Sequence, residues 1–551
     1  MNRRTLLQRL LAALPGGALA GAIAPARAAA PADFTEPAAT GPFTPDWPSL
    51  AAYRTPDWFR NAKFGIWAHW GPQCEPEFGD WYACLMYFEG SDAYRHHVKT
   101  YGHPSKVGFK DIIRRWKAKR WEPDRLVALY KRCGARYFMA MANHHDNFDL
   151  YDSRHQPQWN ALKMGPRRDI VAGWERAARA NGLPFGVSVH AAHAWTWLES
   201  ARNADTKGPL KGVPYDGVLT RAQGAGTWWN GLDPQALYEQ DHPRSTNGDK
   251  LEGIWSQWDW NNGASTPSPA YCRKFYNRTI DLIDKYDPDM VYFDDTVLPL
   301  WPVSDVGLKI AAHMYNRSVA RHGRVEAVIN GKILDEAQRK CLVWDVERGQ
   351  SDRIEPYPWQ TCTCLGNWHY DRALYERKGY KSAATVAQML VDVVSKNGNL
   401  LLNVPVRGDG SIDELEQAIV EDIGRWLAVH GEAVYDTRPW KVFGEGPSVA
   451  GKPMNGPGFN EGRSAPYVGT DLRFTTRGDA VYAFVMGRPE GREVRIASMA
   501  LDAPHLAMPV TRVVLLGSGA ALAFRQTAEA LVVTLPADMP VFRAPFALKV
   551  S

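Results

Sequence analysis

The sequence predicts an α/β protein in which a TIM-like (β/α) barrel is followed by an antiparallel β-sandwich. Apolar runs typical of buried strands alternate with amphipathic helical patterns over roughly 350 residues, and seven or eight such repeats favour a barrel over an open sheet. From Trp440 onward, short alternating segments separated by Gly, Pro and Asp turns replace this pattern. The 551 residues are enough for a barrel and a second module.

The first residues have the character of an export signal. Arg3 and Arg4 precede a weakly apolar stretch that ends in an Ala-x-Ala cleavage pattern, Ala26-Arg27-Ala28. Adjacent arginines at this place are typical of a twin-arginine signal, which directs folded proteins across the inner membrane. The stretch is too short to span a bilayer, and no later segment reaches about 18 uninterrupted apolar residues. We therefore predict a signal peptide over 1–28 and a periplasmic or secreted protein without a membrane span.

Composition excludes some classes of function. Removal of 1–28 takes away four arginines and no acidic residue, which lowers the formal charge from +5 to +1. A nearly neutral chain gives no basis for a nucleic-acid partner. The seven cysteines lack paired C-x-x-C spacing, so we expect buried thiols rather than a zinc site. The 22 Trp and 22 Tyr suit a carbohydrate-binding cleft, although aromatic residues also fill large cores.

The predicted barrel occupies residues 49–439, after a linker at 29–48 that is rich in Ala, Pro and Thr. A long insertion at 208–263, rich in Gly, Trp and Asn, is expected to carry binding loops. The predicted strands are 63–68, 136–142, 184–189, 290–293, 326–329, 342–346 and 400–404. The predicted helices are 109–132, 169–181, 270–286, 305–321 and 384–395.

The sandwich is assigned to residues 440–551, where hardly any helical pattern occurs. Its predicted strands are 480–486, 494–498, 510–516, 522–524 and 530–535.

The strand at 290–293 runs directly into two carboxylates, Asp294 and Asp295. A carboxylate at the carboxyl end of a parallel strand lies at the mouth of a sheet or barrel, where ligands bind. Because successive strand residues point to opposite faces, we expect only one of the two side chains to face the pocket. From this stretch alone, a solvated turn or a helix N-cap is an equally good interpretation.

Four other predicted strands also end in polar side chains, namely His69, His144 with His145, His190, and Asp345 or Glu347. A single histidine after a strand is usually a satisfied core residue. Because five strands deliver histidine or carboxylate at the same end, we expect these side chains to form one site.

Two chemistries could use such a cluster. A metal hydrolase would hold zinc or manganese with histidine and aspartate from several strands. Against it, the first strand has one histidine rather than an H-x-H pair, and the adjacent His144 and His145 should diverge. A retaining glycoside hydrolase needs a nucleophilic carboxylate and a carboxylic acid about 5–5.5 Å apart. Asp294 and Glu347, taken as residues of neighbouring strands, suit that geometry, with histidines and tryptophans to bind the sugar.

Several segments between Trp58 and Trp440 resemble the glycoside hydrolase family 29 α-L-fucosidases. One such match is weak, whereas six in the right order are highly specific, and they cover the whole predicted barrel. In order they are Lys63–Gly71 (KFGIWAHWG), Gly79–Tyr82 (GDWY), Asn143–Phe148 (NHHDNF), Trp159-Asn160 with Gly165–Asp169 (GPRRD), Val291–Asp294 (VYFD), and Asn397–Asn403 (NGNLLLN) followed by Asp409-Gly410.

The resemblance implies roles for particular residues. Asp294 matches the nucleophilic aspartate of the family, and Glu347 resembles its acid/base glutamate, with Glu355 and Asp345 as alternatives. The other interpretation of Glu347 is an ion pair with Arg348 or another partner. The residues that match substrate-binding positions are His69, His144 and His145, which bind fucose hydroxyls in the family, and Trp81, from its E-W-Y segment.

Some positions depart from the family pattern. Asp80 stands where many members have glutamate. Ser188-Val189-His190 stands where they have a Y-Y-S segment, so we expect His190 or His193 to replace a tyrosine near the nucleophile. Lys332 matches an arginine of the family only loosely, and we assign it no role. The segment Asn397–Asn403 is expected to shape the barrel floor.

We therefore predict an exported retaining α-L-fucosidase that requires no cofactor and no metal and acts on fucosylated oligosaccharides or glycoconjugates. Asp294 attacks the anomeric carbon in this scheme, and Glu347 protonates the departing oxygen. The rival interpretations are a related α-L-glycosidase such as an α-L-galactosidase, a catalytically silent carbohydrate-binding protein, and the metal hydrolase. The presence of both carboxylates argues against the silent form. The sequence is also compatible with a homo-oligomer.

Overall fold

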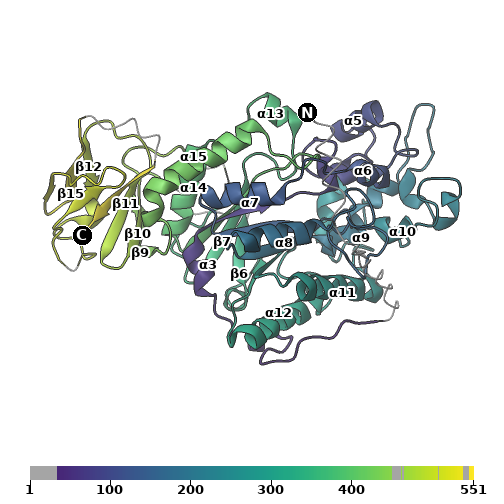
Figure 1. Ribbon diagram of the computed structural model, residues 1–551, viewed down its shortest axis with the longest axis horizontal. Coiled ribbons are helices and arrows are strands. Elements are labelled where there is room, and N and C mark those ends of the chain that lie inside the picture. Colours follow the sequence, from purple (N-terminus) through teal and green to yellow (C-terminus); the bar gives the residue numbers. More distant parts are fainter. Residues whose placement is uncertain (1–33, 450–460, 462–464, 507, 538–544) are drawn as a thin grey trace, which may run out of the picture.

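The computed structural model describes residues 34–449, 461, 465–506, 508–537 and 545–551. The chain forms a closed eight-stranded parallel barrel followed by two antiparallel sheets, which confirms the predicted fold class (Figure 1). The predicted signal peptide at 1–28 and the first part of the linker lie outside the described residues. In the part of the chain that is described, we find no helix with the length and apolar character needed to cross a bilayer.

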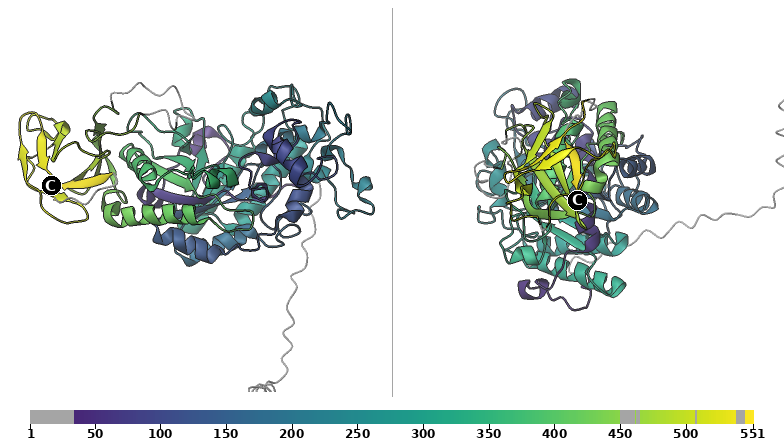
Figure 2. Two further views of the ribbon diagram at one scale, coloured as in Figure 1. Left: turned by 90° about the horizontal axis from the view of Figure 1, so that it is seen from above. Right: turned by 90° about the vertical axis from the view of Figure 1, so that its left-hand side faces the viewer.

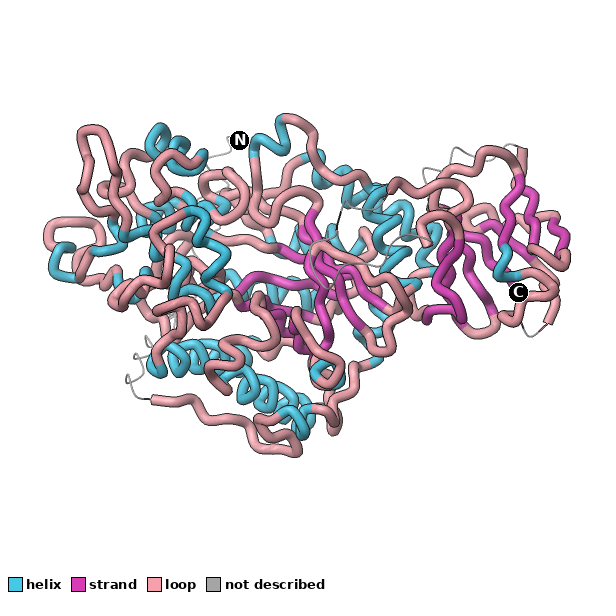
Figure 3. The backbone as a smooth tube through the Cα atoms, turned by 180° about the vertical axis from the view of Figure 1, so that it is seen from behind, coloured by secondary structure: helices cyan, strands magenta, loops and turns pink. Residues whose placement is uncertain are grey.

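The barrel strands pair in chain order, each parallel to the next, and β8 closes on β1. Figure 3 shows them at the centre of this part of the molecule, with helices and loops around them. They are β1 Phe64–Ala68, β2 Tyr137–Asn143, β3 Phe185–Val189, β4 Met290–Phe293, β5 Val328–Gly331, β6 Val343–Glu347, β7 Trp359–Cys364 and β8 Gly398–Asn403.

One barrel strand, β7, is absent from the prediction. Its sequence, WQTCTC, alternates polar residues instead of forming an apolar run, yet all six residues are buried. The polar side chains are satisfied inside the protein: Gln360 donates to Asp345 over 2.8 Å, and Thr361 donates to the carbonyl of Val346 over 2.7 Å. Buried hydrogen bonds of this kind remove the cost that burial of polar groups would otherwise carry.

Helices surround the barrel, and their ends follow local capping rules. In α11, Ser268 caps the first turn by accepting a hydrogen bond from the backbone N–H of Tyr271, and Pro269 occupies the first helical position. The main helices are α3 Asp57–Ala62, α6 Phe109–Arg115, α7 Pro123–Arg132, α8 Ile170–Ala180, α11 Pro269–Tyr286, α12 Val306–His322, α14 Ala383–Ser395 and α15 Glu414–His430. The other helices are α2 Trp47–Leu50, α4 Tyr82–Leu85, α5 Asp92–Thr100, α9 Ala194–Trp197, α10 Gln235–Tyr238 and α13 Arg372–Glu376.

The helix predicted at 109–132 is wrong as a single element. It is divided into α6 and α7, because the chain leaves helical geometry at Trp116 and Pro123 starts a new helix.

The C-terminal unit contains two antiparallel sheets with their own apolar core. The larger has the strand order β13-β16-β11-β10-β9, and the smaller has the order β12-β15-β14. Figures 1 and 2 show this unit at one end of the elongated molecule, with α10 near the other end. The strands are β9 Arg438–Glu445, β10 Leu472–Arg477, β11 Ala480–Val485, β12 Glu493–Ile496, β13 Val513–Leu515, β14 Phe524–Gln526, β15 Leu531–Thr534 and β16 Phe546–Val550.

A buried ionic network joins α14 of the barrel to β10 of the C-terminal unit. Asp392 Oδ1 lies 2.6 Å from Arg473 Nε, and Asp392 Oδ2 lies 2.7 Å from Lys396 Nζ. All three side chains are buried. The buried carboxylate of Asp392 therefore links the barrel to the C-terminal unit through charge-assisted hydrogen bonds.

Candidate active site

A cavity of about 510 Å³ opens at the carboxyl ends of the barrel strands. The place is the one at which (β/α) barrels bind their ligands. Its lining brings together every residue that the sequence assigned to the site, together with several that it did not. The assigned residues are His69, Trp81, His144, His145, His190, Asp294 and Glu347, with Asp345 as an alternative to Glu347, and the additional ones include Trp67, Asp80, Trp258, Tyr292, Lys332, Arg348, Trp368 and His369.

Asp294 directly follows β4 and is surrounded by nitrogen donors. Oδ2 of Asp294 lies 3.0 Å from His190 Nδ1 and 3.1 Å from His145 Nε2, and Oδ1 forms an ion pair with Lys332. Burial alone would raise the pKa of Asp294, but Lys332 and the two histidines hold that pKa well below its usual range. The Asp294 carboxylate is therefore ionised at neutral pH.

Asp295 also lines the cavity, so the expectation that only one carboxylate of the pair could reach it is wrong. The strict alternation of faces ends with β4 at Phe293. Both carboxylate oxygens of Asp295 nevertheless have hydrogen-bond partners within the protein. They accept from the backbone N–H groups of Thr296 and Leu300 at 2.7 and 3.1 Å. It also lies 3.2 Å from Nε2 of His193. Its contacts are those of a residue that shapes the loop.

Glu347 is the last residue of β6, and its carboxylate forms an ion pair with Lys332. Burial raises the pKa of Glu347 above its ordinary value, although Lys332 opposes this shift. The expectation that Asp294 and Glu347 lie on neighbouring strands is wrong, because β5 lies between β4 and β6. Both carboxylates reach the cavity across the end of β5.

Lys332 was missed as a site residue. It follows β5 directly and contacts Oδ1 of Asp294 and Oε2 of Glu347 with one ammonium group. Both carboxylates raise the pKa of Lys332 far above its ordinary value, despite burial that lowers it. The strand was predicted at 326–329 but spans Val328–Gly331, and with the correct end Lys332 would have stood out as another polar residue at a strand end.

The two alternatives to Glu347 have different surroundings. Glu355 accepts a hydrogen bond from the hydroxyl of Ser351 at 2.6 Å and pairs with Arg339 at 3.1 Å. Its backbone N–H donates to the carbonyl of Lys396, just before β8 begins, so Glu355 lies at the amino end of the barrel, opposite the cavity. Asp345 does line the cavity, but Gln360 and Cys362 donate to it, and burial raises its pKa to about 7.

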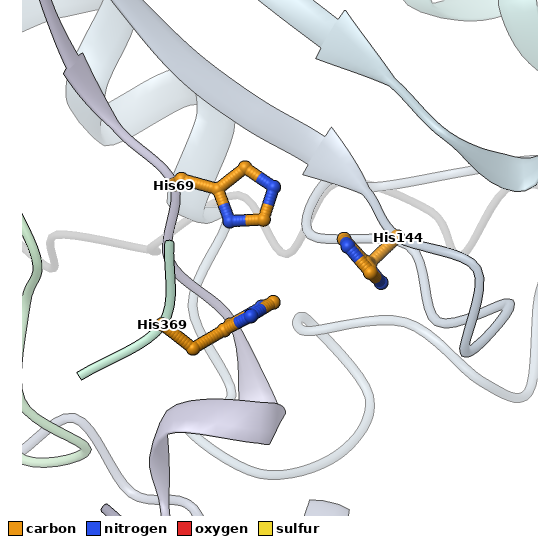
Figure 4. A group of neighbouring side chains, drawn as sticks. All are labelled: His69, His144 and His369. Atoms are coloured by element: carbon orange, nitrogen blue, oxygen red, sulfur yellow. The ribbon is translucent and has the colours of Figure 1, made fainter. Parts of the chain in front are cut away.

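Three histidines meet at one side of the cavity (Figure 4). His69 follows β1, His144 follows β2, and His369, which the sequence did not predict, follows the missed strand β7. The Nδ1 atom of His69 and both ring nitrogens of His369 are buried and have no hydrogen-bond partner in the described part of the chain. The backbone N–H of His369 donates to Asp80 over 2.7 Å. Nδ1 of His369 also lies 3.6 Å from Oδ1 of Asp80, beyond hydrogen-bond distance. Buried nitrogens without a hydrogen bond are suited to polar groups of a ligand.

The histidines also form two groups with the spacing to hold a metal ion, His69 with His144 and His369, and His144 with His145 and His190. The expectation that His144 and His145 diverge is wrong, since their ring centroids are 4.5 Å apart. Hydrogen bonds to other protein groups limit the use of these histidines as metal ligands, however. The amide nitrogen of Gln73 donates to Nδ1 of His144 at 2.7 Å, which leaves the ring proton on Nε2, an arrangement that suits a hydroxyl rather than a metal.

The second group is restricted further. His190 uses both ring nitrogens, one on Asp294 and one on Ser188 Oγ at 3.0 Å. His145 likewise uses both, because its Nδ1 lies 2.7 Å from the carbonyl oxygen of His190. A metal ion bound here would have to replace these contacts. His190 thus occupies the place beside Asp294, as predicted for either His190 or His193, while His193 contacts Asp295.

Aromatic side chains form a large part of the cavity wall. Trp67 lies 5.0 Å from Tyr292 and 5.4 Å from Trp368 between ring centroids, and these three rings make an apolar wall. Trp81 faces Trp258 at 6.3 Å, with an angle of 26° between their planes. Trp258 ends the 3₁₀ segment Leu251–Trp258, so the insertion that was expected to carry binding loops contributes a side chain to the cavity wall.

Comparison with known proteins assigns the chain to a family. The family model for alpha-L-fucosidase matches residues 32–432, and the model for the alpha-L-fucosidase C-terminal domain matches residues 466–550. The bovine (Bos taurus) tissue alpha-L-fucosidase is 26% identical over 487 residues, which cover 86% of this chain and 83% of the bovine protein. The human plasma alpha-L-fucosidase is 26% identical over 406 residues, which cover 72% of this chain and 73% of the human protein.

Solved structures share the fold. The alpha-fucosidase of Thermotoga maritima in complex with fucose superposes with a TM-score of 0.64 at 23% identity and covers 92% of this chain and 100% of its own. An alpha-L-fucosynthase from the same organism gives a TM-score of 0.66 at 24% identity, covering 93% of this chain and 100% of its own. With a family model matched over most of the chain, the protein belongs to the alpha-L-fucosidase family of glycoside hydrolases.

Proposed function

We propose that the protein is a retaining α-L-fucosidase that removes terminal α-L-fucosyl residues from glycans. Asp294 is the nucleophile and attacks the anomeric carbon. Glu347 donates a proton to the departing oxygen, which gives a covalent glycosyl-enzyme, and then removes a proton from the water that hydrolyses it.

The observation that carries this proposal is the shared contact of Asp294 and Glu347 with Lys332. Two contacts of hydrogen-bond length to one nitrogen place the bonded carboxylate oxygens within about 6 Å of each other. Retaining enzymes have carboxyl groups about 5–5.5 Å apart, whereas inverting enzymes need about 6.5–9.5 Å to admit a water. The arrangement therefore favours direct attack by Asp294.

The electrostatics of the two groups match their roles. A nucleophilic carboxylate must be ionised, and the pKa of Asp294 is held well below its usual range, against its burial, by Lys332 and the two histidines. A general acid must keep its proton, and burial raises the pKa of Glu347. Environments that push two carboxyl pKa values apart are the usual basis of such a division of labour.

The walls of the cavity support a 6-deoxy sugar. The apolar wall formed by Trp67, Tyr292 and Trp368 suits a methyl substituent, whereas the hydroxymethyl group of an α-L-galactoside would bury a hydroxyl against it. Histidines that adjoin this wall offer nitrogen atoms to the ring hydroxyls, and the ring centroid of His69 lies 5.0 Å from that of Trp67. We therefore favour fucosylated oligosaccharides or glycoconjugates as substrates.

The test is the Asp294→Ala variant, assayed with nitrophenyl α-L-fucoside. We expect hydrolysis to fall to background while the thermal unfolding curve remains cooperative, and added azide should restore turnover with formation of the β-fucosyl azide. A chelator should leave the wild-type rate unchanged. Residual hydrolysis in the variant, or loss of wild-type activity with chelator, would contradict the mechanism.

A further inference from the structure

A carboxylate of the C-terminal unit reaches the barrel beside the proposed acid/base residue. Glu461 belongs to the connection between β9 and β10, in which it is described while 450–460 and 462–464 are not. Its Oε2 lies 3.1 Å from Nε of Arg348, and its backbone N–H donates to the carbonyl oxygen of Arg348 over 2.9 Å. Glu461 thus holds both the side chain and the backbone of the residue that follows Glu347.

Two further contacts fix Glu461 on the barrel. The hydroxyl of Thr363 in β7 donates to Oε2 over 2.9 Å, and Nζ of Lys381 lies 2.7 Å from Oε1. The side chain of Glu461 is only 15% exposed. With two cationic partners and a hydroxyl donor, the group is built to remain an anion.

Arg348 is itself held in an unusual backbone conformation. Its φ of 46° lies in the left-handed region, which residues other than glycine rarely adopt. The N–H of Arg348 donates to the carbonyl of Cys362 over 2.8 Å, and its C=O accepts from Glu461. The peptide groups on both sides of this strained residue are therefore anchored, one by β7 and one by the C-terminal unit.

We propose that Glu461 is a positioning residue for the reaction: by fixing Arg348, the C-terminal unit holds Glu347 in the orientation that delivers a proton to the leaving group. Arg348 directly follows Glu347 in the chain, and both residues line the cavity. This inference rests on the proposed function, because it assigns a partner to Glu347. It gives the C-terminal unit a part in catalysis in addition to its packing against α14.

The test exploits the dependence of acid catalysis on the leaving group. A dinitrophenolate departs with little protonation, whereas methanol or a sugar needs it. In Glu461→Gln, which keeps the shape and removes the charge, we expect kcat/KM to fall about tenfold for methyl α-L-fucoside and to stay within about twofold for the dinitrophenyl fucoside. Arg348→Ala should show the same pattern, and Glu461→Gln should add no further loss in that background.

The matched control is Glu432→Gln. Glu432 also accepts from a hydroxyl, that of Tyr482 at 2.8 Å, and pairs with Lys549, but it does not line the cavity. We expect no leaving-group dependence in this variant. Equal losses with every leaving group, no loss at all, or additive losses in the double variant would overturn the assignment. An inactive wild-type enzyme would instead overturn the proposed function.

Discussion

Nδ1 of His190 lies 3.0 Å from Oδ2 of Asp294, and this contact is one of those that keep the pKa of the proposed nucleophile low. The other ring nitrogen of His190 lies 3.0 Å from Ser188 Oγ. A neutral imidazole has one donor and one acceptor, so a hydroxyl that donates to Nε2 leaves Nδ1 protonated and able to donate to the carboxylate. Ser188 and His190 together orient Asp294.

The first prediction concerns His190. In His190→Phe the carboxylate of Asp294 loses a donor, and we expect kcat/KM to fall about 10- to 100-fold, the range expected for a hydrogen bond to a charged group. The pKa of Asp294 should rise, so the decline of activity on acidification begins at higher pH. Ser188→Ala, which removes only the hydroxyl at the other nitrogen, should cost less than about tenfold. An unchanged acid limb in a pH profile of His190→Phe would contradict this account.

Lys332 links the two carboxylates, so its removal should move both limbs of the pH profile. The ammonium group favours the ionised forms of Asp294 and Glu347. In Lys332→Met we expect both pKa values to rise. Activity is lost on the acid side as Asp294 becomes protonated and on the alkaline side as Glu347 loses its proton, so both limbs of kcat/KM should shift to higher pH. Lys340→Met, at an exposed lysine, serves as the control, and a shift of one limb alone would argue against a shared partner.

The acid/base assignment is tested by comparing Glu347 with Glu355. Glu347→Ala should lower kcat/KM for methyl α-L-fucoside by about 10²- to 10⁴-fold, with a much smaller loss for a dinitrophenyl fucoside. Glu355→Gln should retain the wild-type dependence on leaving group, because Glu355 lies at the opposite end of the barrel. If the leaving-group effect appeared in Glu355→Gln and not in Glu347→Ala, the two assignments would be reversed.

A stability prediction follows from the network of Asp392, Lys396 and Arg473. Asp392→Ala leaves two buried cations without their carboxylate and should reduce the free energy of unfolding by about 3–5 kcal/mol, as measured by urea denaturation. The pKa of Asp392 is lowered, because its cationic partners outweigh its burial. Its stabilisation is therefore present above the pKa of unfolded aspartate and lost as the pH falls towards the lower folded value.

The exposed pair of Asp422 and Arg425 in α15 provides the control for this experiment. Asp422→Ala should change the free energy of unfolding by less than about 1 kcal/mol, since solvent screens this pair. Similar losses in Asp392→Ala and Asp422→Ala would show that burial of the network adds no stability.

Residue patterns along the chain are enough to predict the fold class, seven of the eight barrel strands and the location of the candidate site. Apolar periodicity is a local property, and polar residues directly after apolar strands mark the carboxyl end of a barrel. His69, His144, His190, Asp294 and Glu347 could therefore be grouped from their positions along the chain. Strand β7 could not be predicted, because its polar residues interrupt the apolar pattern and are buried only through hydrogen bonds inside the protein. His369, which follows this strand, was missed for the same reason.

Which of these groups contact one another depends on how the chain folds in three dimensions. Lys332 lies 38 residues from Asp294 and 15 from Glu347, and Glu461 lies 113 residues from Arg348. No local pattern encodes such contacts, because they form only when the barrel closes and the C-terminal unit packs against α14. The sequence could name the two carboxylates, but the closure of the barrel placed a single ammonium group in contact with both, where it lowers the pKa of each.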